Sequence, residues 1–183
     1  MSDSRIIIYD RTQGWLTLSW VLGAVIAKLL GRVDRVVGVS NWDEFFDACR
    51  AMPKLARIEY WGHGHRGGVT CGAVQMNHGS AQLSSRLLEL TKFVDSNTLL
   101  WWRTCSSFAG KEGHQFALQC SLGLGCRVAG HTFTIWVWQA GLRILKPNET
   151  PLWSPEEGIS EGKNRWSWPW SPASIFCLSA GPK

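Results

Sequence analysis

The 183-residue sequence lacks the cysteine pattern of a disulfide-rich protein. Its six cysteines form no CxxC pair and no dense framework, so we expect them to remain thiols. Because a free cysteine is usually a small core residue, most of the six are expected to be buried. A basic block is also missing, since the net charge of +5 is spread along the chain. We therefore expect no nucleic-acid partner.

The sequence has no apolar run suited to crossing a bilayer. The longest uncharged stretch, residues 12–27, is short for a membrane span and is interrupted by Ser19 and Gly23, so it predicts a buried helix instead. Residues 1–5 lack the basic start and apolar core of a signal peptide. These absences predict a cytoplasmic protein without a membrane partner. Apolar residues recur here at helical spacing, at Trp15, Leu18, Leu22, Val25, Ile26 and Leu29.

The composition is that of a globular protein, with 45% apolar and 18% charged residues. A chain of this length favours a single domain over residues 1–183. Five of the seven prolines lie in residues 146–172, which are expected to form a long loop. Residues 173–179 are a possible final strand.

Strand and helix patterns alternate through the first two thirds of the chain. The predicted strands cover residues 5–10, 35–40, 56–61, 98–104 and 126–130. The predicted helices cover residues 15–30, 41–52, 84–94 and 113–122, with Asn41 as a helix cap. This alternation predicts an α/β fold with a mostly parallel sheet and helices on both faces. Residues 132–144 fit either a strand pair or a strand and a helix.

Two of the predicted strands are followed directly by residues whose side chains can act in catalysis. The strand at 56–61 is followed by His63 between two glycines, and the strand at 98–104 is followed by Cys105. Catalytic side chains collect at the carboxyl ends of strands in open α/β sheets. A histidine beside a cysteine supplies a base that generates the reactive thiolate. The sequence therefore predicts His63 as the base and Cys105 as the nucleophile. The backbone amides of Gly64 and Cys105 are the predicted oxyanion hole.

These two motifs resemble the caspase-like (clan CD) cysteine peptidases, and the bacterial caspase-like (CHAT-type) branch more than the animal caspases. Residues 62–72, GHGHRGGVTCG, are similar to the His-Gly motif of the family, and residues 99–105, LLWWRTC, to its cysteine strand. The spacing of 105 − 63 = 42 residues is near the roughly 50 of caspases. The resemblance covers about residues 5–132. It implies a three-layer αβα caspase-like fold and a cysteine endopeptidase that acts on proteins or peptides without a cofactor.

The resemblance also nominates the residues that select the substrate. In caspase-like enzymes this pocket draws on the end of the first strand and on the position two before the cysteine, which are Asp10 and Arg103 here. An acidic residue selects Lys or Arg before the cleaved bond, whereas a basic residue selects Asp or Glu. The animal motif Gln-Ala-Cys-Arg-Gly is replaced by residues 103–107, RTCSS, so its preference does not carry over. The expectation leans toward Lys or Arg, because Asp10 ends its strand cleanly.

Three other interpretations compete with a peptidase. The first is a catalytically inactive caspase-like module that binds a protein partner. The second is a zinc site built from His63 and His65 with Cys71 or His78, which the following Arg66 disfavours, and we expect no metal. The third is a sugar- or peptide-binding surface made by the alternating Trp166, Trp168 and Trp170. We favour a core-filling role for these tryptophans. The oligomeric state is left open.

Overall fold

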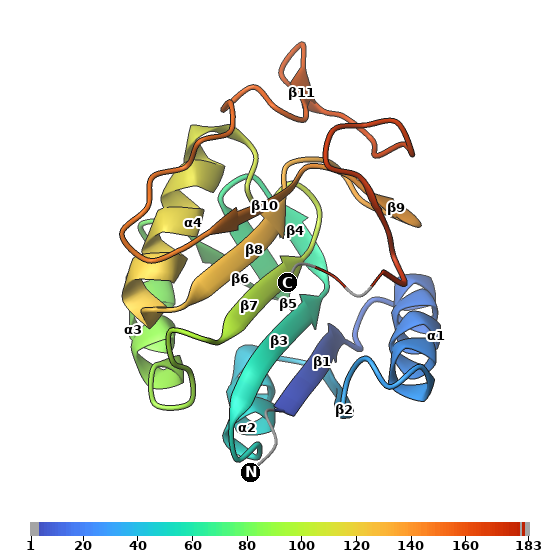
Figure 1. The fold of residues 1–183 in the computed structure, drawn as a ribbon, viewed down its shortest axis with the longest axis vertical. Helices are drawn as coiled ribbons and strands as arrows, with labels where there is room; N and C mark the ends of the chain where they lie inside the picture. The colour runs from blue at the N-terminus through green and yellow to red at the C-terminus, as the bar shows by residue number, and fades with distance from the viewer. Residues whose placement is uncertain (1–3, 180, 182–183) are drawn as a thin grey trace.

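A six-stranded, mostly parallel sheet forms the centre of the computed structural model, which describes residues 4–179 and 181 (Figure 1). The strand order is β10-β8-β7-β3-β1-β2, and only β10 runs antiparallel to its neighbour. The strands are β1 (Ser4–Asp10), β2 (Arg35–Val39), β3 (Leu55–Trp61), β7 (Leu99–Arg103), β8 (Arg127–His131) and β10 (Leu142–Leu145). The predicted α/β class with a mostly parallel sheet is confirmed.

The four helices are divided between the two faces of the sheet. They are α1 (Trp15–Leu29), α2 (Trp42–Arg50), α3 (Ala81–Leu90) and α4 (Gly110–Leu124). The larger core lies where α2, α3 and α4 pack against alternate residues of the sheet, such as Ile58 and Trp102. Helix α1 lies apart from the other three in Figure 1 and packs on the opposite face, against Ile7 and Trp61. Asn41 caps α2 as predicted, because its side chain accepts a hydrogen bond from the Glu44 amide.

Helix α1 forms where predicted, but the prediction that it is buried is wrong. Most of its large apolar residues point outward, whereas Ala24 and Ala27 face the sheet and Trp20 packs partly buried beside them. A Cβ at Gly23 would lie 2.7 Å from the Trp61 ring, so this position requires glycine for the helix to come so close. Small residues therefore set the packing face, because they let the helix axis approach the strands.

A second sheet, absent from the sequence prediction, follows β3 directly. It contains β4 (His63–His65), β5 (Gly68–Cys71) and β6 (Val74–Asn77), paired antiparallel in that order. The sequence indicated only a glycine-rich turn in this region. The strands have three or four residues each, which is too short to show an alternating pattern.

The C-terminal third is mostly irregular. Residues 132–144 hold β9 (Trp138–Gln139) and the start of β10, which pair with different partners. The predicted loop 146–172 contains one short hairpin, β11 (Ile159–Ser160) with β12 (Lys163–Asn164). The expected final strand is reduced to β13 (Ile175–Phe176), which pairs with β9 and lies outside the central sheet. Within the described part of the chain, no helix is both long and apolar enough to cross a membrane.

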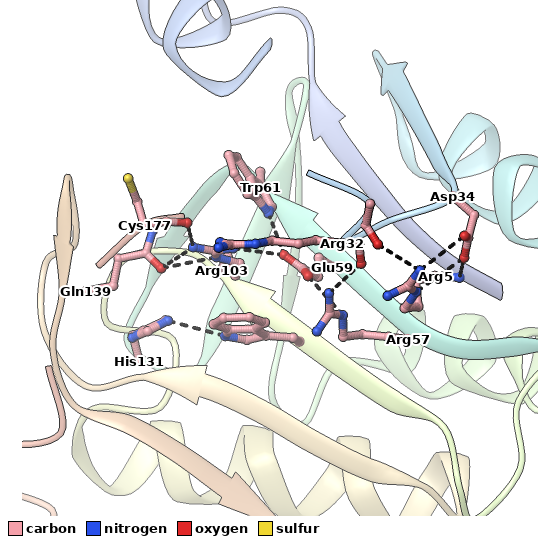
Figure 2. A network of polar contacts seen from close by, with 12 residues as sticks. Arg5, Arg32, Asp34, Arg57, Glu59, Trp61, Arg103, His131, Gln139 and Cys177 are labelled. Atoms are coloured by element: carbon pink, nitrogen blue, oxygen red, sulfur yellow. Dashed lines mark hydrogen bonds and ion pairs between the residues drawn. The ribbon is translucent and has the colours of Figure 1, made fainter. Parts of the chain in front are cut away.

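A buried charge network joins this C-terminal segment to the sheet (Figure 2). The Arg103 guanidinium forms an ion pair with Glu59 at 2.9 Å, and it donates to Gln139 and to the Cys177 carbonyl. It also lies between the rings of Trp61 and Trp101, 4.5 and 4.3 Å from their centroids. Glu59, Arg103 and Gln139 are all nearly inaccessible to solvent. The Arg103 guanidinium on β7 therefore contacts residues of β3, of β9 and of the segment that contains Cys177.

Glu59→Gln is expected to lower the free energy of unfolding by about 3–5 kcal/mol, because it leaves a buried guanidinium without its counter-charge. Urea denaturation followed by circular dichroism measures the change. Glu149→Gln is the matched control, since Glu149 pairs with Lys146 at 3.5 Å on the exposed surface and should change stability by about 0.5 kcal/mol or less. Equal effects of the two substitutions would contradict a structural role for the buried pair.

Candidate active site

A cavity of about 560 Å³ opens at the carboxyl ends of β3 and β7. One wall is helix α1, which contributes Leu16 and Trp20, and the opposite wall is formed by residues 134–139 together with Trp166. Both His63 and Cys105 line this cavity. Its place at the strand ends is where ligands bind in open α/β sheets.

The pairing of β3 with β7 explains why His63 and Cys105 lie at the same rim. Trp61 is paired with Arg103 in the parallel register, and each of the two site residues comes two positions later. The backbones approach closely at Gly64, where an added Cβ would lie 2.6 Å from the Cys105 carbonyl oxygen. Of the two predicted oxyanion residues, Gly64 is therefore the one that must be glycine, because a side chain at this position would clash with the neighbouring backbone.

The cysteine and the histidine are each held by another neighbour. The Cys105 thiol donates to the Ile135 carbonyl at 3.6 Å, and the His63 ring contacts Trp20 edge to face, with 5.7 Å between ring centroids. In the described part of the chain, no hydrogen bond joins the His63 imidazole to the thiol. Burial raises the pKa of the Cys105 thiol. A raised pKa and a thiol that donates to a carbonyl both favour the protonated form at neutral pH.

The residue after the cysteine adopts a strained backbone that was not predicted from the sequence. Ser106 has a φ of 52°, in the left-handed region that non-glycine residues rarely occupy. Its amide donates to the Phe133 carbonyl at 2.9 Å, and its fully buried hydroxyl has no hydrogen-bond partner. Such strain is found at functional sites when the surrounding structure enforces it. Here it turns the chain sharply between Cys105 and α4.

The two residues nominated for substrate selection have other partners. Asp10 is fully buried and accepts hydrogen bonds from Thr12, Gln13 and the Gly72 amide, and it is not among the residues that line the cavity. Arg103 lines the cavity, but its guanidinium is committed to Glu59 and Gln139. Asp10 and Arg103 do not pair with each other. The cavity therefore offers a substrate no free charge from either residue.

Tryptophans dominate the cavity and its rim. Four indoles line it, those of Trp20, Trp61, Trp136 and Trp166. The core-filling role favoured for the alternating C-terminal tryptophans is wrong, since Trp166, Trp168 and Trp170 are 61%, 46% and 79% exposed. Trp168 stacks on Trp170 and meets Trp136 edge to face. These side chains form an aromatic rim beside the cavity.

A second thiol, which sequence reasoning missed, also reaches the cavity. Cys177 lines it and is partly exposed, and burial raises its pKa. Cys177 reaches this position because β13 pairs with β9, a contact between segments about 36 residues apart. No local pattern around Cys177 marks it as a cavity residue.

The residues of the alternative zinc site have other contacts. The His65 Nε2 atom is 2.7 Å from the Asn77 amide oxygen, and the His78 Nδ1 atom is 3.3 Å from the Gly67 carbonyl. Among residues 4–179 and 181, no group of three His, Cys, Asp or Glu side chains is placed to hold a metal ion.

Comparisons of the chain with models of protein families, with curated proteins and with solved structures found no match.

Alkylation of Cys105 by iodoacetamide is expected to be slow at neutral pH and to accelerate with a midpoint above that of free cysteine, because burial disfavours the thiolate. The rate is best measured by mass spectrometry on Cys177→Ala, which leaves Cys105 as the one partly exposed thiol among the five remaining cysteines. The buried cysteines should stay unlabelled in the native protein; these are Cys49, Cys71, Cys120 and Cys126. Rapid labelling with a midpoint below that of free cysteine would contradict the protonated resting form.

Proposed function

We propose that the protein is a cysteine endopeptidase with a His63–Cys105 dyad. The observation that carries this proposal is the position of both residues at the ends of adjacent parallel strands, facing one cavity. A parallel sheet with helices on both faces also supports a three-layer caspase-like arrangement. The motifs around His63 and Cys105 are the part of the sequence that is similar to that family.

The mechanism uses one proton carrier and one nucleophile. His63 takes the proton from the Cys105 thiol, and the sulfur attacks the carbonyl carbon of the scissile bond. The amides of Gly64 and Cys105 stabilise the oxyanion of the tetrahedral intermediate. The C–N bond then breaks, His63 returns its proton to the leaving amine, and a thioester remains. Water hydrolyses the thioester with His63 as base, and the Cys105 thiol is restored. These steps need no cofactor.

Activation requires the thiol to leave the Ile135 carbonyl. A substrate bound in an extended conformation along residues 134–137 can donate a backbone N–H to this carbonyl, because this segment forms a wall of the cavity. The thiol then loses its acceptor and turns toward His63. In this scheme substrate binding completes the dyad, and the pKa that burial raises keeps the Cys105 thiol protonated until then.

The cavity favours a large apolar side chain before the scissile bond. Among the described residues, no Asp or Glu lines it, and Arg103, the one Arg or Lys that does, is already paired with Glu59. A Lys or Arg side chain would therefore lose its hydration without gaining a carboxylate. Indole rings and the aliphatic side chains of Leu16, Ile135 and Val137 instead provide contacts for an aromatic or aliphatic group. The proposed preference thus departs from the Lys or Arg expected from the sequence.

One observation favours a second candidate function, an inactive module that holds an apolar segment of a protein partner. The Cys105 thiol is bonded to the Ile135 carbonyl rather than to His63, and burial raises its pKa. If no ligand shifts it, the cavity binds without cleaving. Both functions use the same apolar cavity, so only turnover separates them.

The deciding experiment compares peptide libraries that carry Phe, Leu, Lys, Arg, Asp or Glu before the scissile bond. We expect the wild type to cleave after Phe and Leu, and Cys105→Ala to show only background. His63→Gln should lower kcat/KM by about 10²–10⁴-fold because it removes the base. Cys177→Ala is the matched control, since it removes a thiol of the same cavity and should change the rate only slightly.

Each other outcome of this experiment has a defined meaning. Equal background turnover by the wild type and by Cys105→Ala would favour the binding module. Cleavage mainly after Lys or Arg would keep the dyad and overturn the apolar preference. Cleavage that survives in Cys105→Ala would overturn the proposed nucleophile.

A further inference from the structure

Helix α1 carries a stripe of apolar side chains that nothing in the structure covers. Trp15, Leu18, Leu22, Val25 and Leu29 are 87%, 61%, 63%, 43% and 81% exposed. They form a continuous outer face along the whole helix, opposite the residues that pack on the sheet. Contiguous exposed apolar patches are uncommon on monomeric proteins, and they mark interaction surfaces. We call these five residues the α1 stripe.

The spacing of the α1 stripe is that of a coiled-coil seam. The intervals along the helix are three, four, three and four residues, which is the repeat of the a and d positions over two heptads. A surface helix that only packs on its own domain needs one apolar face. Helix α1 has two, because Ala24 and Ala27 already pack on the sheet. The second face fits another helix.

The charge of α1 allows a second copy of the same helix to approach. No Asp, Glu, Lys or Arg occurs from Trp15 to Ala27, and Lys28 is the one charged residue of the helix. Two such helices therefore meet without like-charge repulsion along the seam. A helix that lies in a lipid surface typically carries several Lys or Arg residues along its polar face. The single lysine of α1 does not match that pattern.

The size of the α1 stripe is also sufficient for a dimer. Covering the exposed parts of its five side chains removes on the order of 700 Å² per copy, close to the roughly 800 Å² that each partner contributes to a standard interface. In a two-fold dimer the same patch serves both subunits, so one stripe supplies both halves of the contact.

We propose that α1 is a self-association interface, in which the α1 stripes of two copies pack antiparallel with Leu22 next to the two-fold axis. In the antiparallel arrangement the positive end of each helix dipole lies beside the negative end of the other, which is favourable. The two Lys28 side chains lie at opposite ends of the contact. Leu22 is the middle residue of the stripe, so it lies at the centre of the contact. Leu16 and Trp20 of the same helix line the cavity, and the dimer contact therefore supports one cavity wall in each subunit. The proposal does not depend on peptidase activity.

Sedimentation velocity of the full chain at about 1 to 100 µM tests the interface. The wild type is expected to sediment as a dimer over the upper part of this range, and Leu22→Glu as a monomer with the dissociation constant raised about 100-fold or more, because it buries carboxylates at the centre of the contact. Leu152→Glu is the matched control: Leu152 is 94% exposed, lies outside α1 and should leave the dimer intact. Circular dichroism should show all three proteins folded alike.

A mixing experiment separates a specific contact from a general loss of stability. Leu22→Glu and Leu22→Lys are each expected to be monomeric, and their equimolar mixture should recover a dimer because opposite charges then meet near the axis. No recovery in the mixture would contradict the central position of Leu22. A wild type that stays monomeric at the highest concentration would overturn the proposal. Flotation of such a monomer with vesicles of phosphatidylcholine and phosphatidylglycerol, lost in Leu22→Glu, would identify a lipid surface as the occupant instead.

Discussion

The buried guanidinium of Arg103 is the interaction on which the rest of the site depends. A charge in the interior is costly unless it is paired and its donors are satisfied, and Arg103 meets these needs through Glu59, Gln139 and the Cys177 carbonyl. The cation also lies over the rings of Trp61 and Trp101. Arg103 lies two residues before Cys105 and its ring partner Trp61 lies two residues before His63. The packing of this cation therefore fixes the two strand ends from which the candidate dyad emerges.

The sequence allowed the sheet to be predicted because each central strand is a compact apolar run between turn signals. It did not allow the outward face of α1 to be predicted, since periodicity shows that a helix is amphipathic but not which face meets the sheet. Gly23, Ala24 and Ala27 lie on the face of α1 that packs against the sheet, because these small residues permit close approach to Trp61. The core-filling role favoured for Trp166, Trp168 and Trp170 was also wrong, because all three are exposed. In both cases large apolar residues lie outside, where a sequence cannot show what they contact.

The candidate site was predictable only where it follows from strand geometry. His63 and Cys105 line the same cavity because parallel neighbours end at the same edge, and this rule needs only the strand positions. The role of Asp10 required knowledge of side-chain direction. Its carboxylate closes the turn at Thr12 and reaches the Gly72 amide, on a sheet whose short strands gave no pattern. Cys177 required a long-range pairing, which one sequence cannot reveal.

The ion pair of Arg103 with Glu59 is buried in the sheet, whereas the indoles at the cavity rim and the α1 stripe face outward. Helix α1 contributes to both apolar surfaces, because it supplies the stripe and also the Leu16 and Trp20 wall of the cavity. Whatever covers the outer face of α1 therefore acts on a helix that also contacts His63 through Trp20. The proposed dimer contact and the proposed base, His63, are therefore linked in space through this one helix.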